Sequence, residues 1–160
     1  MKPVEQKALT IPNAAAAGLM DDILERGGRF RFRAGGASMV PFVRNGDALT
    51  IAPLANQPPR LGDVVAFSQP TEKGAHLVVH RVVGRQGTAL VVQGDGNGCA
   101  PEVICSENVL GRLVEVERNG RHVRLGLGSE RPLVAWLSRT RLLWILVWPV
   151  WHQVRKLFKP

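Results

Sequence analysis

Gly35–Asp47 reads GGASMVPFVRNGD, and the rest of the chain is best understood outward from this stretch. Two glycines and an alanine precede Ser38, and a second turn signal, Asn45-Gly46-Asp47, closes the segment. Small residues let neighbouring backbone approach closely, which suits a serine nucleophile whose attacked carbonyl must lie against main-chain N–H donors. The same residues are also typical of an ordinary strand–turn–strand with a solvated serine. Segments elsewhere in the chain must therefore decide between these interpretations.

Short apolar runs separated by turn signals surround this stretch. Arg29–Arg33 reads RFRFR, and its alternation predicts a half-exposed strand with Phe30 and Phe32 facing inward. Asn119-Gly120 is the strongest short-range hairpin signal in the chain. We expect further strands over Ala48–Ala52, Val64–Phe67, His76–Gly84, Ala89–Gln93, Val109–Arg118 and His122–Leu127, with a polar loop over Thr71–Ala75. The sequence predicts a mostly β domain over residues 28–127.

A helix is expected before this domain. Apolar residues at helical spacing predict an amphipathic helix over Ala14–Arg26, ended by Gly27-Gly28. It follows a lead-in with no signal peptide, because no apolar core of sufficient length is present there. Residues 1–27 are thus expected to form a lead-in and helix beside the β domain.

Residues 128–160 form a basic, Trp-rich tail. Residues 118–160 contain nine Lys and Arg against one Glu, so they carry the whole formal charge of +8. All four Trp lie in the tail, and Leu142–Trp151 is a run of ten apolar residues flanked by cationic ones. This run is too short to span a bilayer, and its composition is typical of a helix lying in an anionic membrane surface. Packing on the domain or on another subunit is the alternative.

Three short motifs follow one another along the chain. They are Ser-Met-x-Pro at Ser38, His-Arg-Val-Val at His80, and Gly-Asp-Gly-Asn ending at Asn97. This order resembles the signal peptidase I family of serine peptidases, and most closely the branch that uses histidine in place of lysine. The resemblance covers about Gly35–Val116 and implies a signal peptidase-like β-fold. It also implies a serine endopeptidase that cuts an extended peptide with small residues near the cut, without metal or organic cofactor.

The resemblance also assigns roles to residues. Ser38 corresponds to the nucleophile and His80 to the general base, a role that histidine performs because its unperturbed pKa lies near working pH. Asp95 is the preferred carboxylate to orient the imidazole, and Glu102 is the alternative. Gly36 occupies a position where some members carry a serine hydroxyl, so the N–H of Ser38 is the expected oxyanion donor. The substrate is expected to contact Gly36, Ala37, Met39 and Pro41.

Other polar residues receive structural interpretations. Arg81, on the opposite strand face from His80, is expected to be solvated. Asp47 and Asp63 each follow a glycine and are expected to cap turns. His76 is a second candidate base. Cys99 and Cys105 could form a disulfide or remain free thiols, and the sequence leaves both open.

Three functions remain after these observations. The first is a serine endopeptidase working through Ser38 and His80, on a leader-like peptide or on its own chain as in the self-cleaving SOS-repressor relatives of the fold. The second is a non-catalytic module on the same fold that binds a membrane or a partner. The third, nucleic-acid binding through the tail, is the weakest. The basic tail predicts a cytoplasmic protein peripheral to the membrane, and oligomers are compatible with it.

Overall fold

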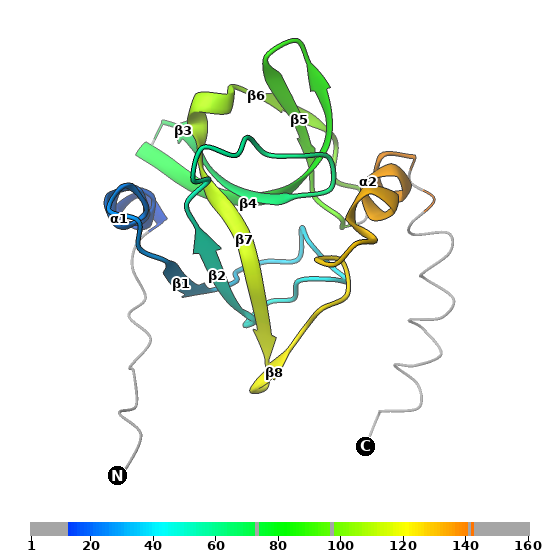
Figure 1. Ribbon diagram of the computed structural model, residues 1–160, viewed down its shortest axis with the longest axis horizontal. Helices are drawn as coiled ribbons and strands as arrows, with labels where there is room; N and C mark the ends of the chain where they lie inside the picture. The colour runs from blue at the N-terminus through cyan, green and yellow to red at the C-terminus, as the bar shows by residue number, and fades with distance from the viewer. Residues whose placement is uncertain (1–12, 73, 97, 141, 143–160) are drawn as a thin grey trace.

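A computed structural model describes residues 13–72, 74–96, 98–140 and 142 (Figure 1). Within them the protein is mostly β: an antiparallel sheet of eight strands, flanked by two α-helices. The strands along the sheet follow the order β1-β2-β7-β3-β4-β5-β6, and β8 pairs with β7. The elements are α1 (Asn13–Glu25), β1 (Phe30–Arg33), β2 (Ala48–Ala52), β3 (Val64–Thr71), β4 (Gly74–Gln86), β5 (Ala89–Gln93), β6 (Glu102–Ile104), a 3₁₀ turn (Ser106–Asn108), β7 (Val109–Arg118), β8 (Arg121–His122) and α2 (Arg131–Arg139).

The centre of the sheet is β3, which lies between β7 and β4. Its first half, Val64–Phe67, is a continuous apolar run, and all four side chains are buried. Val64 and Ala66 belong to one hydrophobic cluster, whereas Val65 and Phe67 belong to a second. Because successive side chains of a strand point to opposite faces, the sheet carries a hydrophobic core on each face.

The neighbouring strand β4 follows the same alternation. Leu77 and Val79 pack against the first cluster, and Val78 and Val82 against the second. His80 lies in register with Val65 of β3, and Arg81 with Val64. By alternation His80 therefore faces the second core, whereas Arg81 faces the first.

The two helices lie far apart in Figure 1, α1 at the left and α2 at the right of the view. In α1, Met20 and Leu24 are buried and join the first core. In α2, Val134 and Ala135 are buried, and Val134 clusters with Phe42. Residues 131–139, expected to be part of the tail, therefore pack on the β domain. The expected in-plane helix over Leu142–Trp151 lies, apart from Leu142, outside the described residues.

The expected elements agree with the structure where the pattern was strong. The helix, the RFRFR strand with Phe30 buried, and the hairpin at Asn119-Gly120 are confirmed. The loop over Thr71–Ala75 is wrong in extent, because β3 and β4 continue as a paired ribbon to Thr71 and Gly74. The polar residues there reflect exposure and not an absence of pairing. Strand β6 was missed, and the strand expected over His122–Leu127 contributes only His122 to β8.

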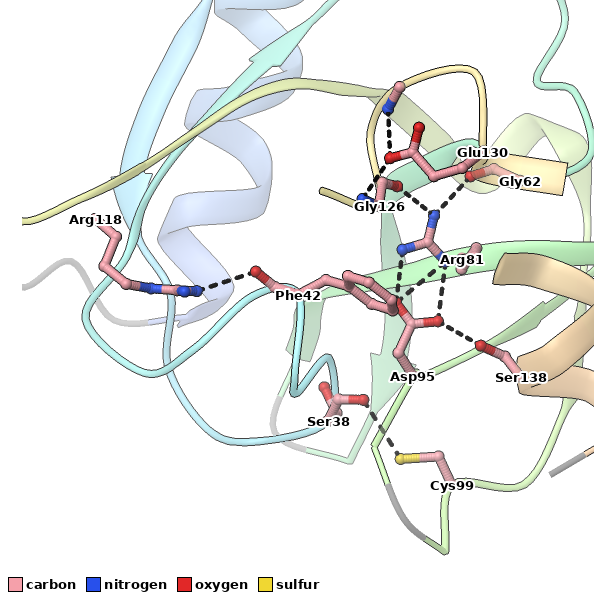
Figure 2. Close-up of polar contacts among 11 residues, drawn as sticks. Ser38, Phe42, Gly62, Arg81, Asp95, Cys99, Arg118, Gly126, Glu130 and Ser138 are labelled. Carbon is pink, nitrogen blue, oxygen red and sulfur yellow. Dashed lines mark hydrogen bonds and ion pairs between the residues drawn. The ribbon is translucent and has the colours of Figure 1, made fainter. Parts of the chain in front are cut away.

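A fully buried ion pair joins β4 to the loop after β5. The guanidinium of Arg81 donates to both carboxylate oxygens of Asp95, with Nη2–Oδ2 at 2.7 Å and Nε–Oδ1 at 2.9 Å, and both side chains are 0% exposed (Figure 2). Its Nη1 donates to the carbonyls of Gly62 and Gly126, and the ring of Phe42 stacks on it at 5.3 Å. The expectation that Arg81 is solvated is wrong, because the residue is 0% exposed and all three guanidinium nitrogens donate to protein acceptors.

Removing Arg81 should therefore cost far more stability than removing an exposed arginine. We expect Arg81→Met to lower the free energy of unfolding by about 3–5 kcal/mol, because the Asp95 charge is left buried without its partner. Arg31→Met is the matched control: Arg31 pairs with Glu117 at the same 2.7 Å, but its side chain is 52% exposed, so its loss should cost under about 1 kcal/mol. Urea denaturation measures both, and equal losses would contradict the prediction.

Candidate active site

The Ser38 turn is exposed at its tip and anchored at its base. Ala34 N–H donates to the carbonyl of Asp47, and Gly46 N–H donates to the carbonyl of Ala34, each at 2.8 Å. Met39, directly after Ser38, is expected to contact the substrate, but its side chain is buried in the first core and not exposed on the turn. Ser38 itself is exposed. The turn thus presents its serine to solvent on a base that the sheet and the core hold.

Asp47 secures the base of this turn from within. Its Oδ2 accepts the N–H of Arg44 at 2.8 Å, which confirms the turn-capping interpretation, and also the guanidinium of Arg118 at 2.7 Å. Burial alone would raise the pKa of the Asp47 carboxyl, but the hydrogen bonds from Arg118 and from the Arg44 N–H outweigh it. Together they hold the pKa of Asp47 below its usual value.

The main chain of Ser38 lies directly against the Gly94–Gly96 loop. Gly96 N–H donates to the Ser38 carbonyl at 2.7 Å, and a Cβ added at Gly94 would lie 2.5 Å from the same oxygen. A Cβ at Gly96 would lie 2.8 Å from the carbonyl oxygen of Ala37. Both glycines are therefore required for this close approach, and they join the Ser motif to the Gly-Asp-Gly motif.

Cys99 lies at the same contact. Its thiol donates to the Ser38 carbonyl, with Sγ–O at 3.6 Å (Figure 2). Burial raises the pKa of the Cys99 thiol, and the charge of Asp95 adds to the effect against an opposing hydrogen bond from Gly96. The group at this position is thus held as a neutral donor. Cys99 and Cys105 are both free thiols, which decides the question that the sequence left open.

His80 is held in one orientation by an acid and an aromatic ring. Its Nδ1 lies 2.9 Å from Oε1 of Glu102, and its ring centroid lies 6.0 Å from that of Phe67. Because a carboxylate only accepts, Nδ1–H donates, and in the neutral imidazole Nε2 then carries the lone pair. The other carboxylate oxygen of Glu102 accepts the side-chain amide of Gln69 at 3.2 Å. Within the described residues Nε2 makes no hydrogen bond, so it is free to accept a proton.

Asp95 lies elsewhere than the sequence interpretation preferred. Its carboxylate is bound by Arg81, and its Oδ1 also accepts the hydroxyl of Ser138 at 2.7 Å (Figure 2). The carboxylate at the ring of His80 is that of Glu102. The preference for Asp95 is therefore corrected in favour of Glu102, the alternative. The register of β4 and β5 explains this difference. Gln93 pairs with Arg81, so the loop after β5 begins next to Arg81, and Asp95 in that loop lies on the same face of β4 as Arg81.

The sheet brings the Ser38 turn and His80 to the same region. Gln93, the last residue of β5, lies opposite Arg81 in the antiparallel β4–β5 pair, so the loop that starts at Gly94 leaves the sheet next to the part of β4 that carries His80 and Arg81. The Ser38 carbonyl lies on Gly94. No hydrogen bond joins Ser38 Oγ to His80 in the part of the chain that the structure describes. The N–H of Ser38 likewise has no acceptor among these residues.

The remaining candidate residues differ in their exposure to solvent. Gly36, with φ +85°, and Ala37 are exposed beside Ser38, whereas Met39 is buried and Pro41, after a cis peptide bond, is half-buried. His76 is exposed near the end of the β3–β4 ribbon. Asp63 caps the Arg60 N–H at 2.8 Å as expected and also binds Arg131. Asn97 lies outside the described residues.

Comparisons of the chain with protein-family models, with curated proteins and with solved structures found no match. Among the described residues, no group of three His, Cys, Asp or Glu side chains is placed to hold a metal ion. None of the helices described is both long and apolar enough to cross a membrane. The geometry above is thus the basis for any functional assignment.

The lowered pKa of Asp47 makes an acid-stability prediction. The folded-state pKa lies below the unfolded value of about 3.9, so this carboxylate stabilises the fold fully above that value and loses its contribution as the pH falls through the folded pKa. At pH 7 we expect Asp47→Asn to unfold at lower urea than the parent protein. The difference should shrink as the pH falls from about 5 to below 3. A difference that is constant across this range would contradict the prediction.

Proposed function

We propose that the protein is a serine endopeptidase in which Ser38 is the nucleophile, His80 the general base and Glu102 the acid that orients His80. The observation that carries the proposal is the imidazole of His80. Glu102 holds its Nδ1 at 2.9 Å, and among the described residues Nε2 makes no hydrogen bond. Arg81, the next residue on β4, pairs with Gln93, from which the loop that supports the Ser38 main chain begins. Base–acid contacts of this kind set the tautomer that a serine nucleophile requires.

The proposed reaction is acyl transfer. As Oγ of Ser38 attacks the scissile carbonyl carbon, Nε2 of His80 takes the hydroxyl proton and later gives it to the leaving amine. The ester formed on Ser38 is hydrolysed by a water molecule that His80 activates in the same way. The unused N–H of Ser38 is the proposed donor to the oxyanion. In free enzymes of this kind the nucleophile–base bond is often long and tightens when substrate binds.

The proposed substrate is an extended peptide with small residues near the cut, which follows from the resemblance to signal peptidase I. Gly36 and Ala37 support it, because both are exposed and carry little or no side chain beside Ser38. Pro41 would support the peptide from beneath. No step in this chemistry calls for a metal or organic cofactor.

A peptidase assay with point variants tests the proposal. The probe is a set of internally quenched extended peptides with alanine at the first and third positions before the cut. We expect Ser38→Ala and His80→Ala to reduce kcat/KM by about 10⁴-fold or more. Glu102→Gln should reduce it by about 10²- to 10⁴-fold, because an amide can hold the ring in the wrong tautomer.

A second His–Glu pair supplies the control. His122 Nδ1 lies 2.7 Å from Glu115 Oε1, and this pair lies at the β7–β8 hairpin, where His122 is exposed and Glu115 half-buried. His122→Ala and Glu115→Gln should leave cleavage unchanged. Full cleavage by Ser38→Ala would rule out the peptidase assignment and favour the non-catalytic binding module.

We also propose that the C-terminal region binds an anionic membrane surface. The supporting observation is the outer face of α2, where Leu133 is 59% and Trp136 is 54% exposed. Nine Lys and Arg against one Glu over residues 118–160 supply the complementary charge. Exposed indole and leucyl groups beside cationic residues are typical of interfacial helices.

Vesicle binding tests this proposal on the full chain. We expect Trp136→Ala to weaken partitioning onto phosphatidylglycerol vesicles by about tenfold, since withdrawing on the order of 50 Å² of apolar surface costs roughly 1.3 kcal/mol at 25 cal/mol/Å². Leu19→Ala, an exposed leucine on α1, which lies far from α2 in Figure 1, should have no effect. Equal binding to neutral vesicles, or binding to duplex DNA instead of vesicles, would overturn it.

A further inference from the structure

Helix α2 docks on three segments that frame the proposed active site. The backbone of Arg131 lies so close to Gly62 that a Cβ there would be 2.5 Å from its carbonyl carbon. Near the end of the helix, the Arg139 guanidinium lies 2.9 Å from where a Cβ at Gly84 would stand. Between these points, Ser138 meets Asp95. The helix therefore contacts the turn before β3, the strand after His80 and the loop after β5.

Ser138 binds the loop after β5 at two places. Its buried hydroxyl donates to Oδ1 of Asp95 at 2.7 Å. Its carbonyl accepts the side-chain amide of Gln93 at 3.4 Å, and the same amide donates to the carbonyl of Cys99 at 2.9 Å. One residue of α2 is thus bonded to the carboxylate in the middle of this loop and to the glutamine that spans its ends.

That loop is also the support of the nucleophile. Gly96, the residue after Asp95, donates its N–H to the Ser38 carbonyl at 2.7 Å, and Cys99 donates its thiol to the same oxygen. The contacts therefore connect Ser138 to Asp95, as Figure 2 shows, and the next residue, Gly96, to Ser38. Ser38 is followed by the buried Met39. The turn is therefore held by the loop at the Ser38 carbonyl and by the core at Met39.

We propose that Ser138 is a positioning residue for Ser38, so that α2 is part of the active site although it follows the β domain in sequence. The proposal rests on the peptidase function proposed above. Arg81 neutralises the charge of Asp95, and Ser138 adds a neutral hydrogen bond from α2 to the same carboxylate. Without the hydroxyl, the Gly96 N–H and the Ser38 carbonyl no longer hold the nucleophile's own N–H on the oxyanion position. Misplacements of about 1 Å at such a position can cost about 10²-fold in rate.

The test compares three full-length variants on the quenched peptides. Ser138→Ala removes the hydroxyl, Ser138→Thr keeps it, and Leu137→Ala trims the adjacent residue, which packs on Phe42 and Val134. We expect Ser138→Ala to lower kcat by about 10- to 100-fold with KM changed less than threefold. Ser138→Thr should recover most of the rate, and Leu137→Ala should retain it.

Hydrogen–deuterium exchange gives a readout that needs no cleavage. In Ser138→Ala the Gly96 amide, which is bonded to Ser38, should exchange about tenfold faster, while amides of β3 keep their protection. Leu137→Ala should leave Gly96 protected. If Ser138→Ala keeps both the parent kcat and the protection of Gly96, or if Leu137→Ala reproduces its effects, the positioning role is wrong.

The two proposals fail in different ways. A parent protein that cleaves none of the peptides, or a Ser38→Ala variant that cleaves them all, refutes the peptidase function. The exchange of Gly96 still decides whether Ser138 supports the Ser38 turn. Should Ser138→Thr fail to fold, as a thermal melt would show, the contrast between Ser138→Ala and Leu137→Ala carries the test.

Discussion

The buried pair of Arg81 and Asp95 is the constraint on which the rest of the structure depends. Arg81 follows His80 on β4, and adjacent residues of a strand face opposite ways, so the position of one side chain determines that of the other. A slip of β4 by one residue would carry the guanidinium out of its acceptors and turn the imidazole into the first core. The ion pair opposes that slip, because Asp95, Gly62 and Gly126 accept from Arg81 at one place only. The direction of His80 is thus set by its neighbour in sequence.

Two other turns are held in the same way, by a buried carboxylate that follows a glycine and binds arginine. Asp47, Asp63 and Asp95 each follow a glycine, each is at most 4% exposed, and each binds arginines from distant segments. Gly46 and Gly62 adopt a positive φ that lets the chain turn, and Gly94 lets the Ser38 carbonyl come close. In each case the carboxylate binds an arginine of the sheet or of α2. The pair of His80 and Glu102 differs, because its side chains are 15% and 29% exposed and one member is a histidine. Structural and proposed catalytic carboxylates are therefore distinguished here by burial and partner, and not by their position in a motif.

Local patterns in the sequence were sufficient for the elements that they specify locally. RFRFR predicts a strand by its periodicity, the short apolar run VVAF predicts one because turn residues precede it, and Asn119-Gly120 predicts its hairpin by turn chemistry. The partner of His80 could not be predicted in this way. It depends on the register of β4, β5 and β6 together, and β6 is a strand of three residues with no periodicity of its own. Arg81 was misjudged for a related reason: a charged residue in an alternating strand indicates solvent unless its counterion is known, and Asp95 comes from a loop. The packing of α2 on the β domain could not be predicted, because the composition of the tail is equally typical of a membrane helix.

The bond between Ser138 and Asp95 has a consequence for biosynthesis. A chain emerges from the ribosome with its N-terminal residues first, so Ser38, His80 and Glu102 are all present before residue 138 has been made. Until then the loop beside Ser38 lacks the hydrogen bond that α2 contributes to it. A nascent chain thus contains every group of the proposed triad before Ser138 can form its hydrogen bond to Asp95. The complete support of the serine is available only to a chain whose synthesis has passed α2.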